Sequence, residues 1–152
     1  RQYKGGFKDR KFHGFGEFKD PSVFDYIGQF VESQFHGKGK MTYQDGSYYE
    51  GFFIYNKRNG FGKLVLRSSS TYVGNFINDK EHGFGELVFT DGMKYKGSFK
   101  FGVKDGMGTL YFPSGVKWVG IFRKGVPWET ATIERDGSTS TFRFVKGKMI
   151  LD

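Results

Sequence analysis

The sequence predicts an all-β protein, built as an elongated, single-layer antiparallel sheet of stacked β-hairpins. Three observations predict it: a strict 23-residue repeat, a high content of glycine and aromatic residues, and no convincing helical pattern before residue 125. A fixed period of about 20–50 residues is typical of arrays in which each unit packs on its neighbours. We therefore expect an open, solenoid-like array rather than one globular core.

The period is visible in the segment HGFGEF at 13–18, which returns as HGFGEL at 82–87, three steps of 23 residues further on. Each unit opens with an aromatic residue, followed by glycine two residues later and phenylalanine four residues later. The opening aromatics are Tyr3, Tyr26, Tyr49, Tyr72, Tyr95 and Trp118. Because residues i, i+2 and i+4 share one face of a strand, these residues define a ladder face, and the opposite side is the reverse face.

A second strand follows in each unit. Ten residues after the opening aromatic comes a polar residue, which is followed by Gly-x-Gly. The polar residue is His13, His36, Asn59, His82 or Asp105. The second strand ends at a turn such as Asp45-Gly46, typical of tight hairpins, although unit three has three serines at 68–70 instead. We interpret the glycines as space for neighbouring rings, so that Gly83→Val would overpack a ring-filled slot. A phosphate-binding loop would need a following helix.

These motifs resemble the MORN (membrane occupation and recognition nexus) repeat: Y-x-G-x-F, a short spacer, H/N-G-x-G and D-G within 23 residues. The resemblance implies a twisted antiparallel sheet of β-hairpins that serves as a binding or scaffolding module. It also implies settings such as cytoskeletal, ciliary or membrane-junction assemblies, and phospholipid binding. Unit three departs from the pattern at its turn, and unit five has Asp105 in place of histidine.

The predicted array covers residues 3–125 and contains about twelve strands, two in each unit. Its units are 3–25, 26–48, 49–71, 72–94, 95–117 and a partial unit 118–125. Trp128 and Glu129 stand where His-Gly is expected, so we predict that residues 126–152 form a degenerate cap that shields the last unit. Because the chain begins with Arg1 rather than Met, we expect it to be part of a longer protein.

Composition limits the cellular setting. The chain has no cysteine, no apolar run of about 18–20 residues and no signal-peptide core, so we expect a soluble protein of the cytoplasm, associated with the cytoskeleton, a cilium or the inner membrane face. The net charge of +8 favours acidic partners, although the basic residues are scattered.

No catalytic or metal site is expected. Equivalent residues of adjacent units lie roughly 10 Å apart, because each unit contributes two strands, so His13, His36 and His82 cannot share one metal ion. We interpret them as residues that hydrogen-bond a turn. With no cysteine and no singular polar cluster, we predict a protein that is not an enzyme and needs no cofactor. Nucleic acid is an unfavoured partner, because the repeat rings and the lysines lie on opposite faces.

The reverse face is the predicted binding surface; the alternative is that strand twist or the chain's own tail buries part of it. Apolar residues on it vary between units, whereas a solvated face of a single-layer sheet is normally polar. The predicted partner-binding residues are Phe52, Ile54, Phe61, Val65, Val73, Phe84 and Val88. Toward the C-terminus the same phase becomes basic. The predicted basic patch comprises Lys94, Lys96, Lys100, Lys117 and Arg123.

Two functions follow from this surface. The first is a protein-interaction scaffold whose partner is a protein segment, such as an amphipathic helix with an acidic end. The alternative is a peripheral membrane module that binds anionic phospholipids through the basic patch, at about 1 kcal/mol for each Lys or Arg near the surface. We favour the scaffold, because the sequence shows neither an amphipathic helix nor an exposed hydrophobic loop that would insert into lipid.

Overall fold

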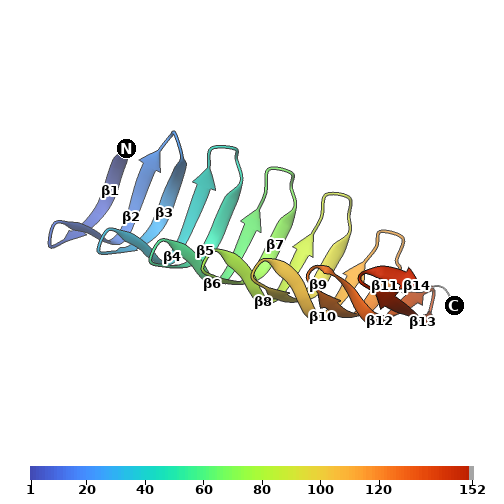
Figure 1. Ribbon diagram of the computed structural model, residues 1–152. Helices are drawn as coiled ribbons and strands as arrows, with labels where there is room; N and C mark the ends of the chain where they lie inside the picture. The colour runs from blue at the N-terminus through green and yellow to red at the C-terminus, as the bar shows by residue number, and fades with distance from the viewer. Residues whose placement is uncertain (151–152) are drawn as a thin grey trace. The chain divides into compact units, whose positions relative to one another are not determined.

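The computed structural model describes residues 1–150, which form fourteen β-strands and no helix. The chain divides into two compact units, Arg1–Lys80 and the residues from Glu81 onward. Within each unit the strands are antiparallel and lie side by side in the order of the chain (Figure 1). The predicted all-β fold of successive antiparallel hairpins in an open sheet is confirmed.

The first unit contains seven strands. They are β1 (Gln2–Lys8), β2 (Lys11–Asp20), β3 (Phe24–Val31), β4 (Gln34–Tyr43), β5 (Tyr48–Ile54), β6 (Lys57–Val65) and β7 (Thr71–Ile77). Glycine opposes glycine near the middle of each pair, as Gly39 does with Gly28 on one side and Gly51 on the other. The middle of the ladder face therefore carries no side chains of its own, which leaves space there for large rings.

The second unit contains the remaining strands. They are β8 (Lys80–Val88), which starts at the last residue of the first unit, β9 (Lys94–Lys100), β10 (Val103–Tyr111), β11 (Lys117–Arg123), β12 (Val126–Arg135), β13 (Ser138–Val145) and β14 (Lys148–Ile150). Glycine again opposes glycine in the β8–β9, β9–β10 and β10–β11 pairs.

The end of the array differs from the sequence prediction of about twelve strands, because β13 and β14 are added by the tail. The predicted boundary after residue 125 falls in the turn of a sixth hairpin, which β12 completes. Glu129, at φ 60°, takes the place of the first glycine of Gly-x-Gly, and Ala131 takes the place of the second, opposite Gly120. The smallest available side chain thus preserves the close strand approach.

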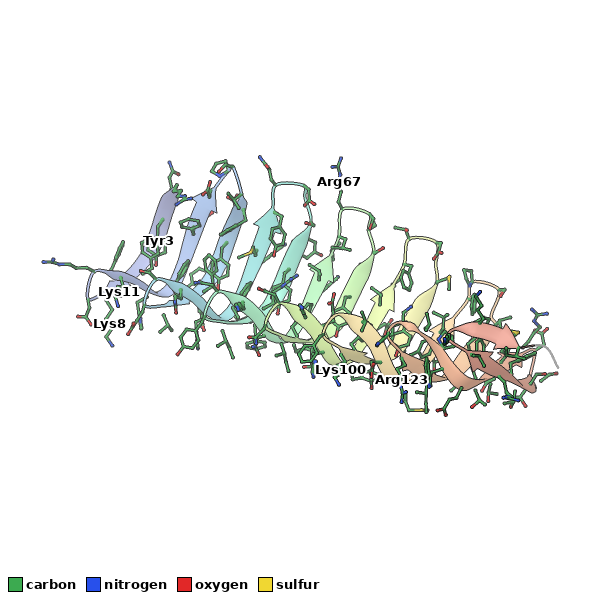
Figure 2. The ribbon with its side chains drawn as sticks, viewed as in Figure 1. Tyr3, Lys8, Lys11, Arg67, Lys100 and Arg123 are labelled. Carbon is green, nitrogen blue, oxygen red and sulfur yellow. The ribbon has the colours of Figure 1, made fainter. Side chains whose placement is uncertain are left out.

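Two kinds of turn alternate along the chain. Within a repeat, two residues with positive φ join the strands, as in Tyr55 (45°) and Asn56 (68°); this is the turn geometry that matches the twist of a hairpin. Between repeats, a longer turn places Gly46 at φ 86°. In unit three Ser69 adopts the same conformation at φ 70°, with matching backbone hydrogen bonds, so the turn forms without glycine. Figure 2 shows Arg67 at the tip of this turn.

The short turns bind each hairpin to the one before it. In the first unit, the second turn residue exchanges two hydrogen bonds with a strand 21 residues earlier. Asn56 N donates to Phe35 O (3.0 Å), and Phe35 N donates to Asn56 Oδ1 (2.8 Å). Ser33 makes the equivalent pair with Phe12. These bonds connect hairpins at their turns, outside the regular strand ladder.

Candidate interaction surfaces

The opening tyrosines build the ladder face. Tyr26 and Tyr49 are fully buried, and each ring lies over the glycine of the following strand. A Cβ atom added at Gly39 would lie 2.5 Å from Cζ of Tyr26, and one added at Gly62 would lie 2.5 Å from Cζ of Tyr49. The interpretation of these glycines as space for rings is confirmed, because no side chain fits beneath the tyrosine.

The tyrosine hydroxyl explains why phenylalanine does not open these units. Each hydroxyl donates a hydrogen bond to the backbone carbonyl three residues later: Tyr26 to Gln29 O (2.9 Å) and Tyr49 to Phe52 O (2.8 Å). Gln29 and Phe52 are also the residues at which the strand register shifts. The hydroxyl therefore stabilises the backbone at an irregularity of the sheet. Burial raises the pKa of Tyr49 to about 12, which keeps this donor protonated.

The first glycine of each Gly-x-Gly has a different role from the second. Gly60 and Gly83 have φ of 91° and 81°, a region that favours glycine. A Cβ atom at the equivalent position would meet nothing within 4 Å at Gly14, Cβ of Phe52 at 3.4 Å at Gly60 and Cβ of Ser98 at 3.2 Å at Gly106, none of which is a ladder ring. The prediction that Gly83→Val overpacks a ring-filled slot is therefore wrong in its reason: backbone strain would cause the cost.

The histidines follow the predicted role in part. His82 Nδ1 accepts a hydrogen bond from Phe101 N (3.3 Å), so this histidine does bind a turn. His36 packs edge-on against the turn residue Tyr55, but its Nδ1 is buried without a hydrogen-bond partner in the described structure. Among residues 1–150, no three acidic or histidine side chains are grouped to hold a metal ion.

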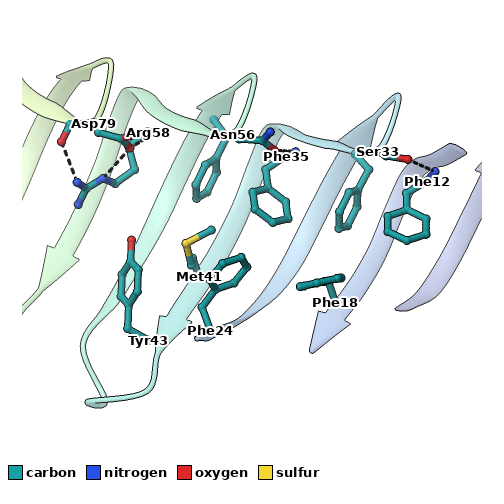
Figure 3. A pocket seen from close by; sticks show the side chains of 12 residues that line it. Phe12, Phe18, Phe24, Ser33, Phe35, Met41, Tyr43, Asn56, Arg58 and Asp79 are labelled. Carbon is teal, nitrogen blue, oxygen red and sulfur yellow. Dashed lines mark hydrogen bonds and ion pairs between the residues drawn. The ribbon is translucent and has the colours of Figure 1, made fainter. Parts of the chain in front are cut away.

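A groove of about 590 Å³ lies on the ladder face of the first unit (Figure 3). Its apolar part is lined by aromatic side chains and Met41, including Phe18, Phe24 and Phe35. Its polar end is formed by Arg58 and Asp79, with Tyr43 nearby, whereas Asn56 lies beside Phe35 (Figure 3). A pocket with an apolar lining and a few polar groups at one place has the usual composition of a binding site.

Arg58 is the central residue of the polar end. Its Nε donates to Oδ1 of Asp79 (3.2 Å), and its Nη2 donates to Asp79 O (2.8 Å). The guanidinium also lies over the rings of Tyr49 and Phe76, 5.8 and 5.4 Å from their centroids. The side chain is 20% exposed, so it combines a fixed orientation with access to a ligand.

Sequence reasoning missed this groove. The ladder face was expected to pack in the same way in every unit, but the repeat position that holds Phe12, Phe35 and Arg58 in successive units varies. Phe12 and Phe35 stack on Tyr3 and Tyr26 at 3.7 and 4.1 Å, and 23 residues further Arg58 takes the equivalent place over Tyr49. The signal available in the sequence was that Arg58 stands at the repeat position where the two preceding units have phenylalanine.

The predicted partner-binding residues occupy the reverse face as expected. In the first unit, Phe52 and Phe61 are 47% and 56% exposed, Ile54 is also exposed, and Val65 and Val73 are half-buried. In the second unit, Phe84 is 64% exposed and Val88 is half-buried. Phe15 on β2 is another exposed ring, absent from the predicted set. Their role in binding stays a prediction.

The predicted basic patch is partly neutralised. Lys94 and Lys96 both lie near the carboxylate of Glu86, at 3.7 and 3.5 Å, and Lys117 lies 3.9 Å from Glu134. Arg123 lies over the ring of Trp128, at 5.0 Å from its centroid. Lys100 has no ion pair with any residue from 1 to 150 and is exposed. The patch is therefore weaker as an anion site than the sequence predicted.

The reason for disfavouring nucleic acid as a partner is also partly wrong. The sequence placed aromatic rings and lysines on opposite faces, but exposed Phe52 lies directly opposite Lys38 on the reverse face. The premise holds for the buried ladder rings and fails for the reverse-face rings. Low affinity for nucleic acid stays a prediction without that support.

A scan against family models matches the MORN repeat five times, at residues 3–22, 26–48, 49–71, 72–94 and 95–117. The chain belongs to the MORN-repeat family. These repeats are generally associated with modules that interact with proteins or membranes, and the family is one of binding repeats rather than of known enzymes. A search of curated proteins finds no match to the chain.

The MORN repeats of this chain thus offer two different surfaces in the first unit: an aromatic groove on the ladder face and exposed apolar side chains on the reverse face. The described residues contain no helix long and apolar enough to cross a membrane.

Proposed function

We propose that this MORN array is a non-enzymatic scaffold or adaptor that binds a segment of a protein partner on its reverse face. The observation that carries the proposal is the exposure of large apolar side chains there. Phe15, Phe52 and Phe61 in the first unit are all at least 47% exposed. Exposed aromatic residues in one region tend to mark an interaction site, and buried aromatic anchors commonly dominate binding energy.

The charges around these rings favour a protein over an anionic bilayer. Glu17 forms an ion pair with Lys19 at 2.9 Å, and Glu50 lies opposite Lys40 on one neighbouring strand and Lys63 on the other. In the second unit Glu86 offsets Lys94 and Lys96. An anionic membrane gains from net positive charge, whereas a protein segment can match alternating charges. An amphipathic helix with an acidic end fits this chemistry.

The membrane alternative has one observation in its favour, the mixture of exposed phenylalanine and lysine on the reverse face, as in Phe52 and Lys38. Co-sedimentation with phosphatidylserine vesicles at low and high salt separates the two functions. The scaffold proposal expects little binding at either salt concentration. Strong binding that falls with salt would favour the membrane function instead.

The protein proposal is tested with the variant Phe52→Ser/Phe61→Ser. We expect it to fold with a melting temperature close to that of the wild type, because both side chains are exposed. In a quantitative pull-down from cells, proteins retained by the wild type should be lost with this variant. Matched retention by the variant, with its fold intact, would contradict the assignment to the reverse face.

A further inference from the structure

The groove on the ladder face of the first unit raises a question separate from the reverse-face proposal. Its lining changes along its length from aromatic side chains to Tyr43, Arg58 and Asp79 (Figure 3). A cation at this position loses hydration; Phe35 fills the equivalent place in the preceding repeat, and Lys104 fills it over the ring of Tyr95 in unit five. Arg58 is distinguished by its carboxylate partner Asp79 and by the aromatic groove beside it, where its remaining N–H groups could contact a ligand.

Arg58 is pre-organised for an acidic group. Asp79 accepts hydrogen bonds from Nε and Nη2, which fixes the plane of the guanidinium over the two rings beneath it. A guanidinium has five N–H donors, and the remaining ones have no acceptor among residues 1–150. A fixed guanidinium loses little freedom on binding, and carboxylates match its paired donors.

One neutral donor, the hydroxyl of Tyr43, lies near Arg58, whereas Asn56 lies one repeat away and holds Phe35 N through its Oδ1 (2.8 Å). The Tyr43 hydroxyl makes no hydrogen bond with the described part of the chain, and burial raises its pKa, so it stays protonated. Asp79 is the one acidic residue in the lining, and its Oδ1 is held by both the backbone N and Nε of Arg58. The end therefore offers the remaining N–H groups of Arg58 and the Tyr43 hydroxyl beside a carboxylate that is already paired.

We propose that this groove binds a protein segment in which an apolar side chain lies next to a carboxylate. The apolar side chain would sit among Phe18, Phe24 and Phe35, and the carboxylate would receive hydrogen bonds from Arg58, with Tyr43 in support. A volume of about 590 Å³ accommodates one or two large side chains. This site goes beyond the proposed function, because it lies on the opposite face and recognises a different chemistry. An adaptor with both sites would join two partners.

The test uses the 152-residue chain and a displayed library of random 12-residue peptides as the probe. We expect enriched peptides to carry Asp or Glu within a few residues of Phe, Leu or Trp. Fluorescence polarisation with a selected peptide then measures Kd. Arg58→Met should weaken binding by about 10- to 100-fold, the range for a charge-assisted hydrogen-bonded pair. Lys57→Met is the matched control, since it removes a charge from the neighbouring residue on the reverse face, and should change Kd less than twofold.

Two further measurements keep the proposal falsifiable. Replacing the peptide carboxylate by its amide should weaken wild-type binding and have little additional effect in Arg58→Met, because both changes remove one interaction. If Arg58→Met fails to fold, Arg58→Lys replaces it, and we expect at least fivefold weaker binding from the loss of paired donors. No enrichment, enrichment without acidic residues, or equal Kd values for Arg58→Met and Lys57→Met would overturn the proposal. Phe61→Ser should leave this Kd unchanged, so the result is independent of the reverse-face site.

Discussion

Strand β5 carries two adjacent phenylalanines, one on each face, and they are buried to very different extents. Phe53, on the ladder face, is 1% exposed, whereas its neighbour Phe52, on the reverse face, is 47% exposed. The ring of Phe53 lies 5.0 Å from Tyr49, 5.3 Å from Tyr26 and 6.1 Å from Phe35. Phe52 instead lies opposite Lys38. Because no second layer covers this sheet, the ring of Phe53 is buried by the other rings on its own face.

Rings on the ladder face become buried because they alternate with glycines. On the ladder face, each tyrosine spreads across a glycine that has no side chain, so neighbouring rings meet edge to face. The reverse face lacks such paired glycines, and its apolar residues are interleaved with charged ones. The comparison indicates that the packed rings of the ladder face maintain the fold, whereas the exposed rings of the reverse face contribute little to it.

The largest expected effect comes from truncating a ladder ring. Phe53→Ala should lower the free energy of unfolding by about 3–5 kcal/mol, because it leaves a cavity among closely packed rings. Phe52→Ala, one residue away, should change it by less than about 0.5 kcal/mol. Urea denaturation of both variants measures the difference. Equal losses would mean that the reverse face belongs to the core.

The next largest effect is expected where a side chain is added beneath a tyrosine. Gly62→Ala places a Cβ 2.5 Å from Cζ of Tyr49, so the ring must move, at a cost of about 1–3 kcal/mol. Gly46→Ala is the matched control, because its Cβ would meet nothing within 4 Å and only the φ of 86° opposes it. We expect a loss of about 1 kcal/mol for the control. Thermal unfolding would contradict this explanation if Gly46→Ala were the more harmful change.

Alkaline pH should weaken the ladder face selectively. Burial raises the pKa of Tyr49, and of Tyr95 in the second unit, to about 12, above the ordinary value of 10.0. The folded state therefore favours the protonated form. Its contribution to stability is complete below pH 10 and falls between pH 10 and 12, by about 1.4 kcal/mol per pH unit for each such tyrosine.

Urea denaturation at pH 9, 10 and 11, with tyrosinate absorbance followed in parallel, measures this loss. Tyr49→Phe should reduce the slope, because it removes one titrating group. Titration of all tyrosines near pH 10 in the folded protein would exclude the proposed burial effect.

The smallest effect concerns the tyrosine hydroxyl at neutral pH. Tyr49→Phe keeps the ring but removes the hydrogen bond to Phe52 O, so the free energy of unfolding should fall by about 1 kcal/mol. Tyr48→Phe, a change at the adjacent residue on the reverse face, is the control and should have little effect. Comparable losses in the two variants would argue against a special role for the bond at the register shift.

The sequence by itself determined the strands of the repeats up to residue 125 and which of their residues face each side. Its 23-residue period places Tyr, Gly and Phe at alternate positions, and alternation along a strand fixes the face on which a side chain lies. This reasoning predicted the buried rings and the exposure of Phe52 and Phe61. It works because the repeated pattern is local and needs no knowledge of distant contacts.

Tertiary structure decided the features that depend on backbone conformation and on contacts between hairpins. The sequence did not separate the glycine required for positive φ at Gly60 from the glycine required for space at Gly62, because both are the same residue type. It also did not reveal that Glu129 and Ala131 complete a sixth hairpin. The groove emerged only from the structure, because Arg58 acquires its orientation from Asp79, 21 residues away on the next turn. Contacts of that range arise from how hairpins pack, which a strand-by-strand pattern does not specify.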